Sequence, residues 1–340
     1  MRSQGRQTAS PLRVYWSVTP EQGSSTYIRT VVSGLRDRGV TVNALSVFEL
    51  LRQRGQIIHI QWPEHISRGT NPFTTALKHG RALGLLVAWK LRGHRLVVTA
   101  HNRTPHHETN AFDSKFRAAV YRNADAVIAL VAGHFELLEQ DGTIDGRIRR
   151  EAIPHPLVTE RVATNRDRSD GALVILGQIH PYHLIEEFIA AWEDSSVQRQ
   201  VIVIGAPGDP ELAERLRRKA STNEALRVYA EFMPDDELAD VLADAVAIVA
   251  LQRNTFNSGA PFDALPRELP VILCEGAQFD DLAQSVGPDW VFAVPETLDA
   301  DDLTDLEAWL RIEREAPVLE RFLPDNVCDA HIGLYESLSD

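Results

Sequence analysis

The chain of 340 residues has very little cysteine and no long apolar run. Its two cysteines, Cys274 and Cys328, exclude a disulfide framework and a C-x-x-C metal site. No uninterrupted apolar segment approaches the roughly 18 residues of a membrane span. The first ten residues, MRSQGRQTAS, lack the apolar core of a signal peptide. We therefore expect a cytoplasmic protein.

Three motifs of common enzyme classes are also missing. No G-x-G-x-x-G follows the first predicted strand, as a dehydrogenase would require, and no G-x-x-x-x-G-K-[ST] marks a P-loop. No G-x-S-x-G elbow indicates an α/β-hydrolase. The net charge of −13 argues against nucleic acid as a partner.

The charge is unevenly distributed along the chain. Residues 1–155 contain 21 Lys and Arg against 12 Asp and Glu, whereas residues 156–340 contain 14 against 36. The segment at 71–96, NPFTTALKHGRALGLLVAWKLRGHRL, mixes apolar residues with five basic ones. Such a segment can lie on an anionic membrane. It also fits an ordinary crossover helix before a strand at 96–100, and the charge split then arises by chance.

Short β-branched runs alternate with amphipathic segments along the whole chain. The predicted strands are at 12–16, 40–45, 56–62, 95–100, 125–130, 172–177, 200–205, 226–230, 246–251, 270–274 and 290–294. This alternation is typical of parallel sheets with crossover helices. It predicts two doubly wound, Rossmann-like α/β domains that face a cleft, with a polar linker at 158–171.

Two loops of the second half are candidates for binding an anion. The strand at 172–176 ends at Gly177, and the following turn carries His180 and His183. A glycine at such a turn lets a phosphate reach backbone N–H groups. After the strand at 246–251, the loop NSGA at 257–260 looks like a helix N-terminus. Each loop alone also fits a plain turn, and the pair together predicts a phosphate site.

Two motifs of the first half carry polar and aromatic residues where a ligand can bind. HIQWPEH (59–65) and TAHNRTPHH (99–107) follow the third and fourth predicted strands, at the edge of the sheet where ligands bind. His101 can accept a proton from a bound hydroxyl because an imidazole titrates near pH 6.5, or it only holds the neighbouring loop. Trp62 can stack on a ring of the ligand, or it is a buried tryptophan at a strand end. Glu64 can hydrogen-bond hydroxyl groups of the ligand or act as an alternative base.

No metal or other cofactor is expected. His101, His106 and His107 lack a recognised ligand spacing, and we expect the last two to brace a loop. Asp-Ala-Asp at 299–301 matches D-x-D, but acidic residues at a helix start are favourable without a metal.

Together these motifs resemble the GT-B glycosyltransferases. The similarity is to bacterial enzymes that build polysaccharide repeat units on lipid carriers, including a mannosyltransferase-like group. It depends on G-x-I-x-P-Y at 177–182, on N-S-G at 257–259 and on the two motifs of the first half, and it spans about residues 12–300. It implies transfer of a hexose from a nucleotide diphosphate sugar, GDP-mannose by preference, to a glycan or lipid-linked acceptor.

The resemblance also implies a division of labour. Residues 1–160 would form the acceptor-side domain, 171–317 the donor domain, and 318–340 a C-terminal helix that packs back across the cleft. The protein would then be cytoplasmic, with possible peripheral contact with the inner face of an anionic membrane.

Site residues follow from the same resemblance. The implied donor-binding residues are Gly177, His180, His183, Glu231, Asn257, Ser258, Gly259 and Asp263. The implied acceptor-binding residues are Gly23, Trp62, Asn102 and His106, with His101 and Glu64 as the catalytic residues.

The donor turn departs from the pattern of the group, G-x-I-R-P-Y-K-G, in which Arg and Lys hold the diphosphate. His180, His183 and Leu184 stand at the Arg, Lys and final Gly positions. Thr255 and Asp263 stand where many relatives have two glutamates. These departures leave two other interpretations open, a non-catalytic GT-B module that binds a partner or glycan, and a GT-B epimerase acting on a nucleotide sugar.

Overall fold

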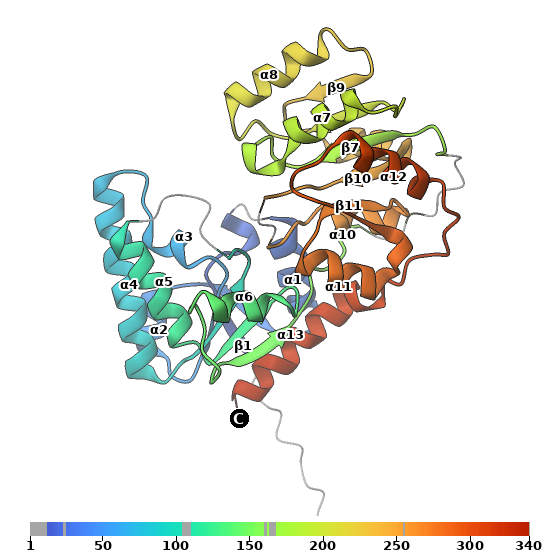
Figure 1. Cartoon of the computed structure of the whole chain (residues 1–340). Helices are drawn as coiled ribbons and strands as arrows, with labels where there is room; N and C mark the ends of the chain where they lie inside the picture. The colour runs from blue at the N-terminus through green and yellow to red at the C-terminus, as the bar shows by residue number, and fades with distance from the viewer. Residues whose placement is uncertain are drawn as a thin grey trace, which may run out of the picture. The chain divides into compact units, whose positions relative to one another are not determined.

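The chain forms two compact α/β units in the computed structural model (Figure 1). The structure describes residues 12–22, 25–103, 110–159, 162, 168–253 and 256–339. Unit 1 consists of Met1–Pro156 and Leu323–Asp340, and unit 2 is Leu157–Phe322. No helix in the described ranges is long and apolar enough to cross a membrane.

Unit 1 is built on a six-stranded, parallel sheet of order β2-β1-β3-β4-β5-β6. Its strands are β1 (Arg13–Trp16), β2 (Thr41–Ala44), β3 (Ile57–Ile60), β4 (Arg95–Ala100), β5 (Ala126–Ala129) and β6 (Arg149–Ala152). Every residue of β3 and β5 is buried, as expected for strands covered on both faces. The order reverses between β1 and β3, so a ligand crevice is expected at the carboxyl ends of these strands.

The helices of unit 1 begin and end at recognisable signals. They are α1 (Thr26–Asp37), α2 (Val47–Arg52), α3 (Pro63–Ser67), α4 (Pro72–Arg92), α5 (Ala111–Arg122), α6 (His134–Gln140) and α13 (Pro324–Ser339), with a 3-10 turn, η1, at Pro20–Gln22. In α4, Asn71 and Thr74 form a capping box, and Gly93 ends the helix with φ 64°. The segment at 71–96 is therefore a crossover helix followed by a strand.

Helix α13 returns to unit 1 from the far end of the sequence. A Cβ atom at Gly34 of α1 would lie 2.5 Å from Cys328 Sγ of α13, so the close packing of the two helices requires glycine there. His331 and Tyr335 of α13 are fully buried in the core of unit 1. The helix starts at Pro324, six residues after the predicted start.

Unit 2 has a second parallel sheet, of order β12-β11-β10-β7-β8-β9. Its strands are β7 (Ala172–Leu176), β8 (Val201–Ile204), β9 (Leu226–Tyr229), β10 (Ala245–Val249), β11 (Val271–Cys274) and β12 (Val291–Val294). The order reverses between β7 and β10, so the loops after these two strands lie side by side at the switch point.

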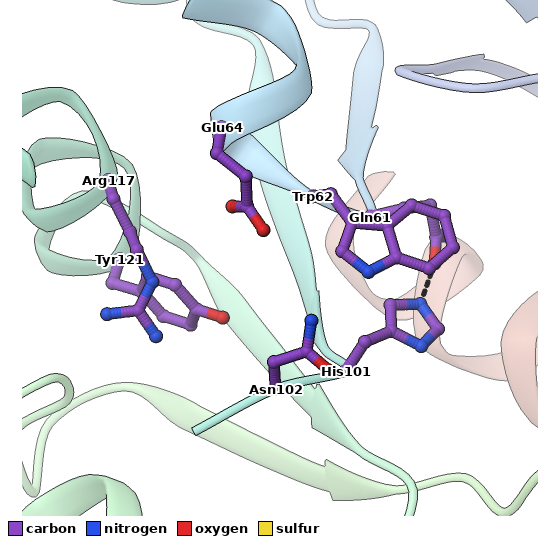
Figure 2. Close-up of a pocket in the computed structure, with 7 residues that line it drawn as sticks. All are labelled: Gln61, Trp62, Glu64, His101, Asn102, Arg117 and Tyr121. Atoms are coloured by element: carbon purple, nitrogen blue, oxygen red, sulfur yellow. Dashed lines mark hydrogen bonds between the residues drawn. The ribbon is translucent and has the colours of Figure 1, made fainter. Parts of the chain in front are cut away.

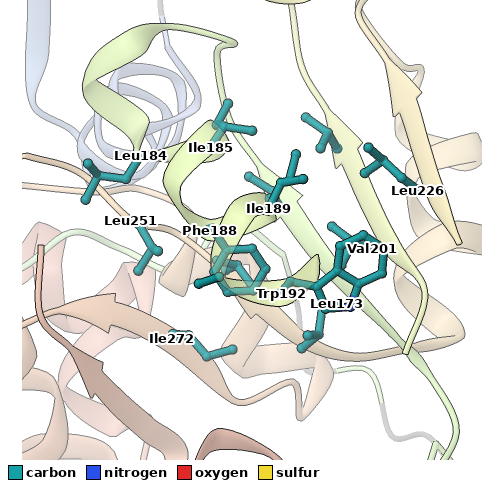
Figure 3. Close-up of a cluster of buried hydrophobic side chains, with 14 of the residues drawn as sticks. Leu173, Leu184, Ile185, Phe188, Ile189, Trp192, Val201, Leu226, Leu251 and Ile272 are labelled. Atoms are coloured by element: carbon teal, nitrogen blue, oxygen red, sulfur yellow. The ribbon is translucent and has the colours of Figure 1, made fainter. Parts of the chain in front are cut away.

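Helices cover this sheet through apolar faces. They are α7 (Ile185–Asp194), α8 (Pro210–Ala220), α9 (Asp235–Ala243), α10 (Pro261–Ala264), α11 (Ala277–Val286) and α12 (Ala300–Leu310), with 3-10 turns η2 (Pro181–His183), η3 (Leu265–Arg267), η4 (Pro288–Trp290) and η5 (Glu320–Phe322). Figure 3 shows Phe188 and Trp192 of α7 beside Leu173 of β7. The Asp299 side chain accepts from the amides of Asp301 and Asp302, so the D-x-D sequence caps α12 as predicted.

The predicted fold class is confirmed, because each half forms a doubly wound parallel sheet. Each predicted strand is present, and β6 is an additional one that the sequence did not reveal. The start of the predicted linker already belongs to unit 2. The amide of Val158, its first residue, donates to Phe262 O at 3.0 Å, and the amide of the preceding Leu157 donates to Phe322 O at 2.9 Å.

Candidate functional site

A pocket in unit 1 lies at the carboxyl ends of β3 and β4 (Figure 2). It is lined by Gln61, Trp62, Glu64, His101, Asn102, Arg117 and Tyr121. The first three residues follow β3, the next two follow β4, and the last two lie one turn apart on α5. Neighbouring parallel strands end at the same edge of a sheet, which brings these side chains together. Four predicted site residues, Trp62, Glu64, His101 and Asn102, thus share this pocket.

His101 is held on three sides. Its Nε2 lies 2.6 Å from Oε1 of Gln61. Its ring stacks on Trp62 with centroids 4.3 Å apart and meets the ring of Tyr27 edge-on at 5.1 Å. Burial, with smaller contributions from His155 and His65, lowers the pKa of His101 to about 3. The expectation that this imidazole titrates near neutral pH is therefore wrong, since desolvation disfavours its charged form.

The opposite wall of the pocket carries a carboxylate, a phenol and a cation. Glu64 is in the first turn of α3, after Pro63, and Figure 2 shows its carboxylate pointing into the pocket. Burial raises the pKa of Tyr121 to about 12, while the charge of Arg117 lowers it and the weaker effect of the Glu64 charge raises it. The Arg117 guanidinium lies 4.9 Å from the centroid of the Tyr121 ring. A carboxylate acceptor, a protonated phenol and an aromatic platform suit a sugar with several hydroxyl groups.

Three of the lining residues were not predicted. Gln61 lies inside the HIQWPEH motif, so its position beside a strand end was a usable signal. Arg117 and Tyr121 have four-residue spacing on a helix, and nothing local marks them as part of a site. Two predicted acceptor residues, Gly23 and His106, lie outside the described residues.

In unit 2, the turn after β7 is tightly packed. Gly177 has φ 147°, a conformation that favours glycine, and its amide donates to Ile204 O at 3.1 Å. A Cβ atom at Gly205, after β8, would lie 1.6 Å from Gly177 O. Glycine is therefore required at both positions.

The two histidines of this turn flank a tyrosine. The ring of Tyr182 lies 4.3 Å from that of His180 and 4.3 Å from that of His183, centroid to centroid. Nδ1 of His180 is buried and makes no hydrogen bond within the described part of the chain. Leu184 follows with φ 51°, a left-handed conformation that favours glycine, the residue that the resembled group has at this position.

The N-cap expected at 257–258 is wrong. Helix α10 starts at Pro261 after Ala260, without a side-chain cap, because proline at the first helical position has no N–H to satisfy. The amide of Ser258 donates to Oε1 of Gln278 at 2.8 Å, and Nε2 of Gln278 donates back to Ser258 O at 2.8 Å. This amide is therefore already satisfied by the protein.

The remaining predicted donor residues occupy different settings. Asp263 forms an ion pair with Arg267, with Oδ1 3.3 Å from Nη2, within the α10–η3 segment. Glu231 is exposed between β9 and α9. Within the described ranges, no three His, Cys, Asp or Glu side chains gather as a metal site would require.

Comparison with known proteins gives one distant group of sequence relatives and many structural ones. No family model matches the chain. A GDP-mannose:glycolipid 4-beta-D-mannosyltransferase from Xanthomonas campestris pv. campestris is 23% identical over an alignment of 317 residues, and the match covers 88% of this chain and 83% of that protein.

Three solved structures cover nearly the whole chain. AviGT4, a glycosyltransferase involved in avilamycin A biosynthesis, has a TM-score of 0.62 at 14% identity. The match covers 97% of this chain and 98% of AviGT4. Two further structures each have a TM-score of 0.65 at 11% identity, and each match covers 96% of this chain and 99% of the other protein. They are Anabaena HepE in complex with UDP-glucose and the lipopolysaccharide outer core galactosyltransferase WaaB. The chain thus has the GT-B fold, and its sequence is similar to that of a glycosyltransferase.

Proposed function

We propose that this chain transfers a hexose from a nucleotide diphosphate sugar, with GDP-mannose as the donor, to a glycan or lipid-linked acceptor. The observation that carries the proposal is the pocket of unit 1, where Trp62, Glu64, His101 and Asn102 converge. The mannosyltransferase relative supports the choice of donor and acceptor, because it is named for GDP-mannose and a glycolipid.

Unit 2 is the donor half in this proposal. The turn at 177–183 and the loop at 257–259 follow β7 and β10, at the switch point where doubly wound sheets bind ligands. His180 and His183 supply donors to the diphosphate, and Glu231 lies toward the nucleobase. The chain needs no metal for this, since imidazolium groups can stabilise the leaving diphosphate.

Unit 1 is the acceptor half, and Glu64 is its general base. A neutral imidazole whose pKa is about 3 is a weak proton acceptor, which leaves the Glu64 carboxylate as the stronger candidate in the pocket. Glu64 removes the proton from the attacking hydroxyl, while Trp62 stacks on the sugar and Asn102 and Arg117 bind its other oxygens. Gly23 and His106 are proposed to complete the acceptor side.

A membrane face follows from the surface of α4. Its exposed apolar side chains lie on one side of the helix and are Phe73 (80% exposed), Leu77, Leu83, Val87 and Leu91. Lys90 and Arg92 are in the last turn of the same helix. We propose that this stripe rests on the inner face of an anionic membrane, where a lipid-linked acceptor is available.

The decisive experiment measures transfer of labelled mannose from GDP-mannose to lipid-linked acceptors. Glu64→Gln should lower kcat by about 10²–10⁴-fold with donor binding retained, because it removes the base and keeps the shape. The matched control is Glu136→Gln on the exposed surface of α6, which should retain the activity of the parent. A Glu64→Gln variant as active as the parent would overturn this role.

A non-catalytic module is the second candidate. It is favoured by the histidines at the two cation positions and by the Ser258 amide, which Gln278 already occupies. Nucleotide-sugar binding without transfer or hydrolysis would establish that role, and recovery of an epimerised sugar would indicate an epimerase.

Membrane binding is tested with liposomes. The parent should bind anionic vesicles at low salt and lose binding at high salt, because salt screens surface charge within about 8 Å. Phe73→Ser with Leu77→Ser, or Lys90→Glu with Arg92→Glu, should each weaken binding. Failure to bind anionic vesicles at low salt would favour a soluble acceptor.

A further inference from the structure

A continuous series of hydrogen bonds, buried from Tyr335 to Gln61 and half-buried at His101, connects the C-terminal helix to the pocket of unit 1. The hydroxyl of Tyr335 lies 2.6 Å from Nδ1 of His59. Nε2 of His59 lies 3.1 Å from Nε2 of Gln61 and 2.8 Å from Oγ1 of Thr99. Oε1 of Gln61 then lies 2.6 Å from Nε2 of His101 (Figure 2). Tyr335, His59 and Thr99 are fully buried, and Gln61 is 1% exposed.

The side-chain amide of Gln61 determines which atom carries the proton in each of these hydrogen bonds. An amide oxygen only accepts and an amide nitrogen only donates. Gln61 directs its oxygen at His101, so Nε2 of His101 must carry a proton. The Gln61 nitrogen donates to Nε2 of His59, and the Thr99 hydroxyl, 2.8 Å from the same nitrogen, donates to it as well. The proton of His59 is therefore on Nδ1 and is donated to Tyr335.

The charge state of the groups agrees with this order. Burial holds the pKa of His59 well below its usual value, and the pKa of the Tyr335 phenol well above its own. Both histidines are therefore neutral near pH 7, and each has one protonated and one bare ring nitrogen. A neutral imidazole can exchange these two forms, so a neighbouring group must select one.

We propose that Tyr335, His59 and Gln61 are positioning residues that fix His101 in its Nε2-protonated tautomer. The stack on Trp62 and the edge contact with Tyr27 fix the plane of the His101 ring. The hydrogen bonds through His59 and Gln61 determine which of its nitrogens bears the proton. The C-terminal helix thus holds the Trp62–His101 wall of the pocket. The part of this inference that concerns acceptor binding rests on the proposed function, whereas the tautomer does not.

The test reads the ring nitrogens of His59 and His101 directly, by ¹⁵N NMR of the full chain near pH 7, with each signal assigned by single His→Gln replacement. Protonated and bare ring nitrogens differ widely in ¹⁵N shift. We expect a proton on Nε2 of His101 and on Nδ1 of His59. A His101 ring protonated on Nδ1 would overturn the proposal.

Gln61→Glu gives the sharpest outcome. A carboxylate accepts at both oxygens, so His101 should keep its Nε2 proton while His59 moves its own proton from Nδ1 to Nε2. Tyr335→Phe removes the terminal acceptor and should mix the tautomers of both histidines. The matched control is Tyr15→Phe, which removes the hydroxyl of another buried tyrosine of unit 1, on β1, and should leave both signals unchanged. Unchanged tautomers in Gln61→Glu, with the introduced carboxyl shown by ¹³C NMR to be ionised, would contradict the proposed order of protons, even if Tyr335→Phe fails to fold.

Activity supplies an independent readout. Loss of one hydrogen bond is worth about 1 kcal/mol, so Tyr335→Phe should raise the acceptor KM about fivefold with the donor KM unchanged. If the parent transfers no sugar, the proposed function fails, while the NMR result still decides the tautomer. An equal rise of both KM values would reduce Tyr335 to a purely structural role.

Discussion

The indole of Trp62 lies over the imidazole of His101, with ring centroids 4.3 Å apart and an interplanar angle of 21°. These residues come from the ends of two neighbouring strands, β3 and β4. Trp62 is half-buried, so one part of the indole is fixed by the stack and the rest is open to a ligand.

Truncating this platform should weaken acceptor binding. Trp62→Ala should raise the acceptor KM about fivefold, since aromatic contacts are worth about 1 kcal/mol beyond their buried area. Trp62→Phe should retain most of the affinity, and the donor KM should not change in either variant. Initial rates measured against each substrate separate the two constants. An equal rise of the donor KM and the acceptor KM would contradict the assignment of Trp62 to acceptor binding.

Mild acid should destabilise unit 1. Burial lowers the pKa of His331 to about 4, whereas an unfolded histidine titrates near about 6.5. The unfolded chain therefore binds more protons below pH 6.5, and the stabilisation is complete above that pH and lost as the pH falls toward 4. One such histidine lowers the free energy of unfolding by about 2 kcal/mol when the pH falls to about 5.

Urea unfolding at several pH values checks this. His331→Leu removes the titrating group and should reduce the fall in unfolding free energy between pH 6.5 and 5 by about 2 kcal/mol. His65→Leu, on the exposed surface of the same unit, is the control and should keep the slope of the parent. An unchanged slope in His331→Leu would mean that this ring is protonated in the folded state.

Leu184 combines a strained backbone conformation with a side chain that is packed in the core. Its φ of 51° costs about 1–2 kcal/mol for a residue other than glycine, yet its side chain is fully buried in the core of unit 2. Leu184→Gly relieves the strain and leaves a cavity that costs about 2–5 kcal/mol, so the net effect should be destabilising by about 1–3 kcal/mol. Leu184→Ala keeps the strain and should lose more. Chemical denaturation of both variants gives the order, and the reverse order would show that the strain is negligible.

The histidines of the donor turn should respond to replacement by permanent cations. A leaving diphosphate gains negative charge in the transition state, and cations directed at it lower the barrier. His180→Arg with His183→Lys should tighten donor binding, because Arg and Lys carry a permanent positive charge.

Calorimetric titration of the parent and the double variant with GDP and GDP-mannose measures this. An unchanged affinity in the double variant would favour the non-catalytic module.

The amino-acid sequence determined the architecture, because buried parallel strands leave continuous apolar runs such as IIHI and VIVI. It failed for β6, whose sequence RREA is largely exposed. An edge strand pairs with one neighbour and needs no apolar run, so only the β5–β6 ladder reveals it. The sequence also located the strand ends that carry Trp62, Glu64, His101 and Asn102.

Tertiary structure decided the chemistry of these residues. Burial, which no local pattern reports, moved the pKa of His101 away from the value that made it a candidate base. Gln278 reaches Ser258 across 20 residues and occupies the amide that the sequence offered to a phosphate. Tyr335 meets His59 across 276 residues, because α13 packs back on unit 1. Hydrogen bonds between residues this far apart follow from packing, so they became visible only once the chain was folded.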